Sequence, residues 1–254
     1  MARALIGHTG FVGGTLRRQT GFDHLYNSTN IEQIAGKEYE LLACAGAPAA
    51  KWIANREPDR DIANLERLMS SLAKTKVRTF VLISTIDVYP NPVDVDEDTI
   101  IEPDEGHAYG RHRLRLEHFA RDRFDATAIR LPGLFGPGLR KNVIYDLLHD
   151  NQLEQVCAQS VFQFYDLEQL WSDVERTLVH GLKLVNFATE PTSVEEVARQ
   201  VFGFELSQPG LQPPAFYNFK SKHAPLFGGS RGYLYSKAQV LSSMDRFVEA
   251  QRKA

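Results

Sequence analysis

Three glycines close to the start of the chain have the spacing of a phosphate-binding turn. Gly7, Gly10 and Gly13 follow the apolar run 3–6, and residues 15–18 can continue as a helix. A turn from strand to helix offers an anion free backbone N–H groups and the positive end of the helix dipole. Glycine permits the tight turn and the close approach of a pyrophosphate. The pattern therefore predicts a dinucleotide-binding turn, although an ordinary loop can also have this spacing.

Hydroxyl groups follow another expected strand. Residues 77–83 form a β-rich run that leads into Ser84 and Thr85. In a parallel sheet the carboxyl ends of the strands border the ligand crevice. Tyr109 and Arg113 lie four positions apart on an expected helix and so share one face. From the residues alone these side chains also have structural interpretations, as a strand-end hydroxyl and a half-buried helix residue.

The end of the second expected strand, residues 22–27, bears on the choice of cofactor. An acidic residue there favours NAD, and a basic residue favours the 2′-phosphate of NADP. The chain has Asn27 and Ser28 at this place, while Arg17 and Arg18 can supply charge from the first helix. NAD and NADP therefore both stay open, with a lean to NADP, and an ordinary polar turn is the alternative.

The chain alternates between strand and helix patterns. Expected strands cover residues 40–44, 77–83, 126–131 and 183–187, and expected helices cover residues 59–74, 108–123, 142–149, 170–181 and the stretch from Ser236. This alternation predicts an α/β fold, a doubly wound parallel sheet of Rossmann type with a small C-terminal substrate lobe. We expect a dinucleotide-binding domain in residues 1–131, rejoined by 159–190, and the lobe in residues 132–158 and 191–254.

Composition narrows the range of partners. The chain of 254 residues is 43% hydrophobic and 24% charged, and its formal net charge of −3 gives no broad basic surface for nucleic acid. No apolar run approaches the length of a membrane helix, and the start lacks the pattern of an export signal, so we expect no membrane and a cytoplasmic location. Cys44 and Cys157 lie far apart in apolar surroundings, where thiols are usually buried and unbridged. A small molecule is the expected partner.

Two groups of residues could suggest a metal site. Residues 90–107 carry many carboxylates, and His107, His112 and His118 lie close by in the sequence. The carboxylates lack the spacing of a calcium loop, and the histidines do not share one helix face. We interpret residues 90–107 as a solvated loop and expect no metal.

Several motifs, taken in order, resemble those of one family. Residues 7–13 match its glycine motif, Asn64 its mid-helix asparagine, 84–89 its strand with the active hydroxyl, 130–138 the loop that closes over the nicotinamide, and 236–238 the start of its C-terminal helix. Over nearly its whole length the chain resembles the extended short-chain dehydrogenases/reductases, in the branch of NAD-dependent epimerases/dehydratases. Most members of that branch act on nucleotide-linked sugars.

This resemblance implies a catalytic set and a cofactor site. Thr85 would hydrogen-bond the reacting oxygen, Tyr109 would give or take its proton, and Arg113 stands where the family has lysine. The implied cofactor contacts are Gly7, Thr9, Gly10, Phe11, Val12, Gly13, Asn27, Ser28, Ala45, Gly46, Asn64, Ser84, Tyr109, Arg113, Pro132 and Gly133.

Arg113 departs from the family's Tyr-x-x-x-Lys pattern. A positive charge beside the phenol lowers its pKa from an ordinary value of about 10, and arginine provides such a charge. Its planar group differs from lysine in reach toward the ribose hydroxyls, and it does not release a proton. Catalysis is therefore expected to be slower or arranged differently.

The resemblance further implies a nucleotide sugar as the small-molecule substrate, and a homodimer. The candidate substrate contacts are Asp87, Arg140, Lys141 and Asn142, and Ile86 beside Asp87 argues against a dehydratase. We expect an NAD(P)-dependent oxidoreductase or epimerase that acts on a sugar carbonyl or hydroxyl. The alternative is a catalytically inactive or regulatory NAD(P)-binding protein on the same fold.

Overall fold

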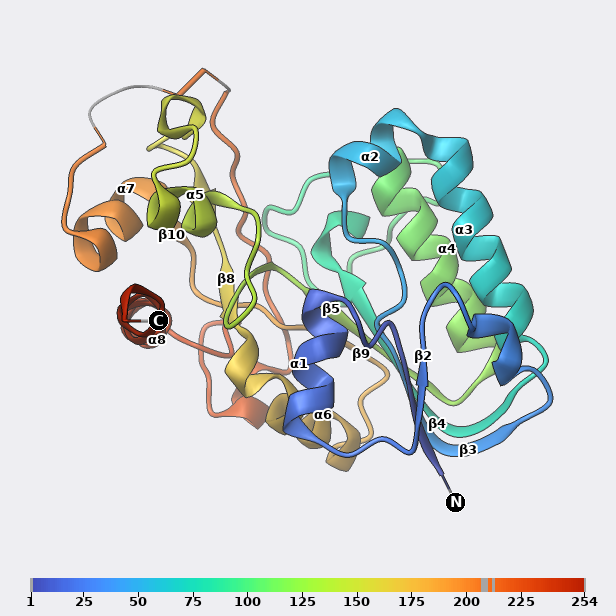
Figure 1. The fold of residues 1–254 in the computed structure, drawn as a ribbon. Coiled ribbons are helices and arrows are strands. Elements are labelled where there is room, and N and C mark those ends of the chain that lie inside the picture. Colours follow the sequence, from blue (N-terminus) through green and yellow to red (C-terminus); the bar gives the residue numbers. More distant parts are fainter. Residues whose placement is uncertain (1, 207–209, 212, 254) are drawn as a thin grey trace. The chain divides into compact units, whose positions relative to one another are not determined.

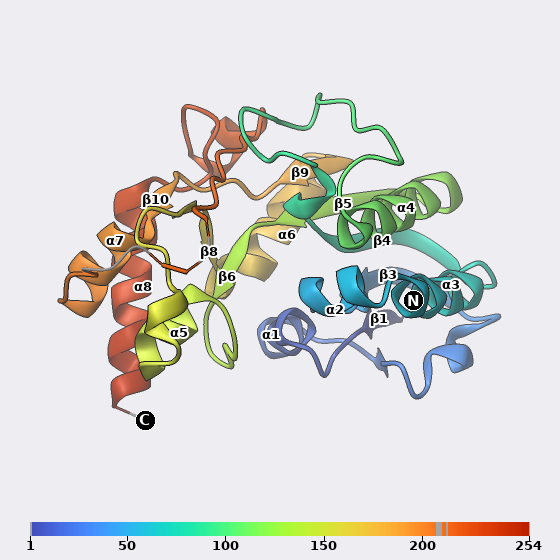
Figure 2. The ribbon, with the colours of Figure 1, turned by 90° about the horizontal axis from the view of Figure 1, so that it is seen from above.

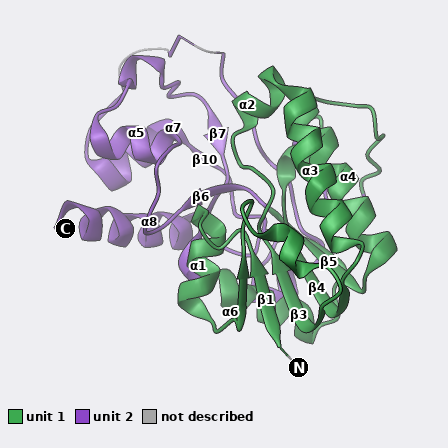
Figure 3. Ribbon diagram, turned by 45° about the vertical axis from the view of Figure 1, so that its right-hand side comes forward, with its two compact units in different colours: residues 1–91, 99–130, 170–185 green, residues 92–98, 131–169, 186–254 purple. Residues whose placement is uncertain are grey.

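The structure of the protein is a computed structural model that describes residues 2–206, 210–211 and 213–253. The chain forms two compact units, which are described separately below (Figure 3). Unit 1 comprises residues 1–91, 99–130 and 170–185, and unit 2 comprises residues 92–98, 131–169 and 186–254.

A six-stranded parallel sheet forms the centre of unit 1, in the order β2, β1, β3, β4, β5, β9 (Figure 1). The strands are β1 (Arg3–Ile6), β2 (His24–Tyr26), β3 (Glu38–Cys44), β4 (Lys76–Thr85), β5 (Ala126–Leu131) and β9 (Leu184–Asn186). At Ile6, β1 pairs with Tyr26 of β2 and with Cys44 of β3. Because the strands are parallel, the glycine turn, the segment after β3 and Thr85 all lie at one edge of the sheet.

Helices cover both faces of this sheet, as alternating side chains along the strands require. On one face, α3 (Pro58–Leu72) packs against α4 (Ala108–Arg123) (Figures 1 and 2). The buried core there contains, among others, Ile6, Leu42, Cys44, Phe80, Leu82, Leu65, Leu68, Leu116 and Ala120. The intervening strand residues point to the other face, where α1 (Phe11–Gln19) contacts α6 (Leu170–Val179). The short helix α2 (Lys51–Arg56) lies against α3 and α4.

Within its described residues, unit 2 consists of short strands and three α-helices. Its strands are β6 (Gly133–Phe135), parallel to β8 (Phe164–Asp166), and β7 (Val161–Phe162), antiparallel to β10 (Thr192–Ser193). Its helices are α5 (Val143–His149), α7 (Val194–Val197), which continues as a π-helical turn, and α8 (Lys237–Arg252). The apolar face of α8 supplies Val240, Met244 and Val248 to a buried core with Phe135 and Ile144. Ser193 and Ser236 form capping boxes that begin α7 and α8.

The expected Rossmann-like α/β fold is confirmed. The expected rejoining segment, 159–190, is divided in the structure: residues 170–185 belong to unit 1, and residues 159–169 and 186–190 belong to unit 2. The reason is that β7 and β8 pair with β10 and β6 instead of with the central sheet.

The acidic segment 90–107 is more than a solvated loop. The Glu97 carboxylate accepts hydrogen bonds from the backbone N–H of Asn186 at 2.8 Å, from the Ser221 hydroxyl at 2.6 Å and from the backbone N–H of Lys222 at 2.9 Å. These bonds tie residues 92–98 into unit 2, which corrects the simple solvated interpretation.

The structure was also searched for a membrane-spanning helix, a metal site and a disulfide, none of which the composition led us to expect. Among the described residues, no helix combines the length and the apolar character needed to cross a bilayer. Within the same residues, no group of three or more histidine, cysteine, aspartate or glutamate side chains is arranged to hold a metal ion. Cys44 and Cys157 are both buried and unbridged.

Candidate functional site

The glycine turn of unit 1 has the backbone geometry that the spacing predicts. Gly7 has a φ of +84°, and a Cβ atom there would lie 2.2 Å from the Ala45 carbonyl oxygen. A Cβ atom on Gly13 would lie 2.1 Å from the Gly7 carbonyl oxygen. Glycine is therefore required at both positions. Gly10 is the N-cap of α1 and offers no side chain, so no capping side chain competes for the first N–H groups of this helix.

Next to this turn, a buried imidazole nitrogen has no hydrogen-bond partner. His8 Nδ1 is buried and unpaired, and His8 Nε2 lies 3.5 Å from Asn27 Nδ2. Asn27 is largely committed to its own turn, where its Oδ1 accepts from the backbone N–H and the hydroxyl of Thr29. Ser28 is exposed, and so is Thr9, while Phe11 and Val12 are half-buried. His8 is a candidate cofactor contact that the sequence analysis missed.

Thr85 and Tyr109 come together as expected. Their side chains share a hydrogen bond, and Thr85 Oγ1 also accepts from the backbone N–H of Asp87 at 3.2 Å. Close packing makes this possible, because a Cβ atom on Gly110 would lie 2.2 Å from the Asp87 carbonyl oxygen. The Tyr109 ring is buried, and burial raises the pKa of its phenol, against the opposing influence of the Arg113 charge.

Arg113 lies beside Tyr109, but most of its donors are already used. Its guanidinium donates to both oxygens of the Asp61 carboxylate and to the Pro48 carbonyl, and its carbon Cζ lies 4.1 Å from the centre of the Tyr109 ring. Arg113 is only 2% exposed, and its Nε is buried without a partner. His112 Nδ1 lies 2.8 Å from the same carboxylate. Although burial opposes it, hydrogen bonds from Arg113 and His112 hold the pKa of Asp61 below its ordinary value.

Ser84 faces away from Thr85, because successive residues of a strand point to opposite sides. Its hydroxyl is bonded to the buried Glu117 carboxylate, which also binds Arg130 at 2.6 Å. Arg130 in turn donates to the Tyr89 hydroxyl at 2.8 Å. The Ser84 side chain therefore belongs to a buried network between β4, β5 and α4, and the expected contact of Ser84 with the cofactor stays a prediction.

The expected mid-helix asparagine, Asn64, does not face the interior of unit 1. Asn64 is exposed on α3, while Asp61, one turn earlier, is the buried polar residue that binds α4. Helical periodicity alone did not distinguish these two positions.

The short helix α2 adds two residues that sequence reasoning missed. Asn55 Oδ1 accepts from the backbone N–H of Tyr109 at 2.9 Å, and Lys51 Nζ lies 2.8 Å from the Asp87 carboxylate.

The expected contacts from Pro132 onward lie in unit 2. Pro132 is half-buried, and the backbone N–H of Gly133 donates to the Gln163 carbonyl in the pairing of β6. Arg140 and Lys141 are exposed. Asn142 has a structural task instead of a free side chain: its Oδ1 caps α5 by accepting from the N–H groups of Ile144 and Tyr145, and its Nδ2 donates to the Leu134 carbonyl. The polar atoms of its side chain are therefore committed to this cap, and its expected role in substrate binding stays a prediction.

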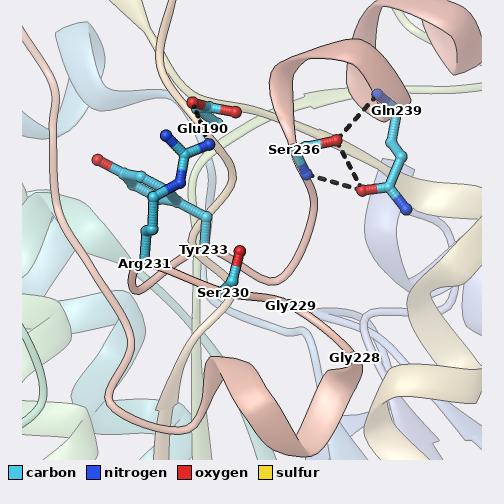
Figure 4. A pocket seen from close by; sticks show the side chains of 8 residues that line it. All are labelled: Glu190, Gly228, Gly229, Ser230, Arg231, Tyr233, Ser236 and Gln239. Carbon is cyan, nitrogen blue, oxygen red and sulfur yellow. Dashed lines mark hydrogen bonds and ion pairs between the residues drawn. The ribbon is translucent and has the colours of Figure 1, made fainter.

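A small pocket of unit 2 is lined by the two partners of an internal ion pair, Arg231 and Glu190. The pocket has a volume of about 60 Å³ and lies beside the start of α8, where Ser236 and Gln239 form the capping box (Figure 4). Arg231 donates to Glu190 at 3.0 Å, and the same carboxylate accepts from the backbone N–H of Lys237 at 2.9 Å. The positive end of this helix is thus occupied by the chain's own carboxylate.

The residues of unit 1 fit a nicotinamide dinucleotide. The turn has no room for Cβ atoms at Gly7 and Gly13, the first N–H groups of α1 are uncapped, and two buried nitrogens near the expected cofactor positions, His8 Nδ1 and Arg113 Nε, have no partner. Buried polar atoms normally have hydrogen-bond partners, so these two nitrogens are available to a ligand that supplies one.

Comparisons with known proteins agree on the fold. No protein-family model and no curated protein sequence matches the chain. Among solved structures, UDP-glucose 4-epimerase of Thermotoga maritima with UDP-glucose has a TM-score of 0.73 at 18% identity, over 100% of this chain and 99% of that one. The NAD-dependent NDP-hexosamine 5,6-dehydratase TunA has a TM-score of 0.75 at 16% identity, with the same coverage. RMD from Pseudomonas aeruginosa, complexed with NADPH, has a TM-score of 0.70 at 16% identity, over 99% of this chain and 100% of that one. The chain therefore has the fold of these three proteins.

Proposed function

We propose that this protein is an NAD(P)-dependent oxidoreductase or epimerase that acts on a carbonyl or hydroxyl of a nucleotide-linked sugar. The observation that carries the proposal is the hydrogen-bonded pair of Thr85 and Tyr109, which lies in the same unit as a side-chain-free glycine turn. The fold shared with nucleotide-sugar enzymes supports it.

In this proposal the chain binds, orients and exchanges a proton. The backbone amides after Gly7 and at the start of α1 hold the pyrophosphate, and Thr85 hydrogen-bonds the reacting oxygen of the sugar. The Tyr109 phenol gives a proton to that oxygen or takes one from it. The nicotinamide, when bound, supplies or accepts the hydride.

Arg113 takes over part of the task of the family's lysine. Its guanidinium lies over the phenol ring as a permanent positive charge, since Asp61 and Pro48 hold it in place. Its unpaired Nε–H is the donor that it can still offer to the cofactor. The remaining substrate candidates are Asp87, Arg140 and Lys141.

A ligand panel tests cofactor and substrate together. A ligand bound only by the folded protein raises the melting temperature, so we expect stabilisation by NAD or NADP and further stabilisation by one class of nucleotide sugar.

Tyr109→Phe should abolish turnover and leave cofactor affinity within about tenfold. Turnover that survives in Tyr109→Phe excludes the proposed proton transfer.

The second candidate is a binding or regulatory protein that holds NAD(P) without chemistry. The commitment of the Arg113 donors to Asp61 and Pro48 favours it. Stabilisation by the cofactor, with no turnover of any sugar in the panel and no loss of binding in Tyr109→Phe, selects this function.

A further inference from the structure

The positive charge of Arg113 cannot move toward a reacting group. Its guanidinium is bonded to both oxygens of Asp61 and to a backbone carbonyl, and it is buried against the face of the Tyr109 ring. It also does not release a proton near neutral pH. A positive charge that can move or lose its proton at this site must therefore come from another side chain.

One face of α2 provides that cation. Lys51 and Asn55 are four residues apart, so their side chains lie on the same side of the helix. Asn55 holds the backbone N–H of Tyr109 at 2.9 Å, and Lys51 holds the Asp87 carboxylate at 2.8 Å. Asp87 is itself fixed to the site, since its N–H is bonded to Thr85 and its carbonyl packs on Gly110.

We propose that Lys51 is a positioning residue of this site: it holds the Asp87 carboxylate beside the Thr85–Tyr109 pair and neutralises that carboxylate there. The effect of Lys51 on the pH dependence of turnover rests on the proposed function, whereas its position beside Asp87 does not. The Lys51 side chain is 38% exposed, against 18% for that of Asp87, so Lys51 can be replaced without leaving a buried charge in the core.

The charges that face the Tyr109 phenol have opposing effects. From its own helix, Arg113 lowers the pKa of the phenol; after β4, Asp87 raises it; from α2, Lys51 lowers it. Asp61 of α3 is hydrogen-bonded to Arg113. The His107 ring, 6.2 Å from the Tyr109 ring, is influenced by the same pair: burial lowers its pKa first, Lys51 and Arg111 lower it further, and Asp87 raises it. His107 is therefore a built-in reporter of the Lys51–Asp87 pair.

The first experiment reads this reporter in the protein without cofactor. We measure the pKa of His107 by NMR titration, with the resonance assigned from His107→Gln. Lys51→Met removes a positive charge and exposes Asp87, so the pKa of His107 should rise by about half a unit to one unit. Asp87→Asn should lower it, and Lys51→Met combined with Asp87→Asn should return it close to the wild-type value, because the net charge is then unchanged.

The second experiment reads the reaction. In Lys51→Met, the limb of the pH–rate profile that reports Tyr109 should move to higher pH by about one unit. Lys51→Arg should keep it in place, and the double variant should restore it. Lys76→Met is the matched control, because Lys76 is exposed and is paired with Glu38 at 2.6 Å; neither readout should change.

The two failures are distinguishable. An unchanged pKa of His107 in Lys51→Met overturns the inference, as does an unchanged pH limb in a variant that still turns over. A shifted His107 in a protein that turns over no sugar supports the placement of the charge pair and overturns the proposed function instead.

Discussion

At the scale of single residues, the most consequential feature is the buried ion pair between Arg113 and Asp61. Asp61 and Arg113 are 6% and 2% exposed, and two hydrogen bonds join them. A buried ion pair adds little over a well-packed apolar pair, but the loss of one partner leaves an uncompensated charge. Asp61 and Arg113 therefore depend on each other.

Asp61→Asn tests this dependence. We expect the free energy of unfolding to fall by about 3 kcal/mol at neutral pH, because the buried guanidinium loses its charged partner. Since the pKa of Asp61 is lowered in the folded protein, its contribution is complete above the pKa of the unfolded carboxyl, about 4, and is lost as pH falls through the folded value. Urea unfolding from neutral to acidic pH should show the difference from wild type shrinking below about pH 4.

The control is Asp59→Asn. Asp59 is exposed in the first turn of the same helix, so this change should lower the free energy of unfolding by less than about 1 kcal/mol. Equal losses in both variants contradict the paired role.

At the scale of elements, α1 allows a comparison of two adjacent glycines. A Cβ atom on Gly13 would lie 2.1 Å from the Gly7 carbonyl oxygen, whereas the nearest atom to a Cβ on Gly14 is 3.7 Å away. Of these two glycines, only Gly13 allows the helix to pack directly against the glycine turn. The second is an ordinary helix position, where alanine is favoured over glycine by about 1 kcal/mol.

We therefore expect Gly13→Ala to lower the melting temperature and to reduce the stabilisation by NAD(P), because the turn must open to accommodate the methyl group. Gly14→Ala should leave that stabilisation unchanged and raise the melting temperature or leave it unaltered. Thermal melts with and without cofactor check both. If Gly13→Ala retains the full effect of the cofactor, the turn does not bind the pyrophosphate.

Local patterns predicted the elements and the turn, and contacts between distant residues escaped prediction. The glycine turn, β4 with Thr85 and α4 with Tyr109 each depend on a few consecutive residues, so their spacing was sufficient. Asp61 binds a residue 52 positions later, and periodicity along α3 could not select it over Asn64. Strand alternation could have separated Ser84 from Thr85, and the position of Asn142 directly before the apolar run of α5 could have marked it as a cap.

The helix that supplies Lys51 and Asn55 has only six residues. Helices of this length form through tertiary contacts more than through propensity, which explains why the sequence did not show it.

At the scale of the whole molecule, unit 1 depends on a segment from late in the chain. Trp171, at the start of α6, is buried against Phe22 with ring centres 6.0 Å apart and lies 5.0 Å from the Arg3 guanidinium carbon. Its backbone N–H donates to the Gln19 side chain at 3.0 Å. These contacts join the two ends of unit 1.

The two tryptophans provide a test of this closure. Trp171→Ala should lower the free energy of unfolding by about 3 kcal/mol, the usual cost of removing a buried large aromatic side chain. Trp52 is 61% exposed on α2 and lies under the Arg56 guanidinium, so its replacement by alanine should change the free energy of unfolding by less than about 0.5 kcal/mol. Denaturant unfolding followed by circular dichroism measures both. A similar cost at the two positions contradicts the closing role of α6.

The division of unit 1 into three stretches of chain also has a consequence during synthesis on the ribosome. Residues 131–169 separate β5 from α6 and β9, so the sheet receives its last strand only after that whole insertion has been translated. Until then the outer edge of β5 has no neighbour, and an unpaired edge invites pairing with other chains. Premature termination in residues 131–183 thus releases a polypeptide with an open template for aggregation.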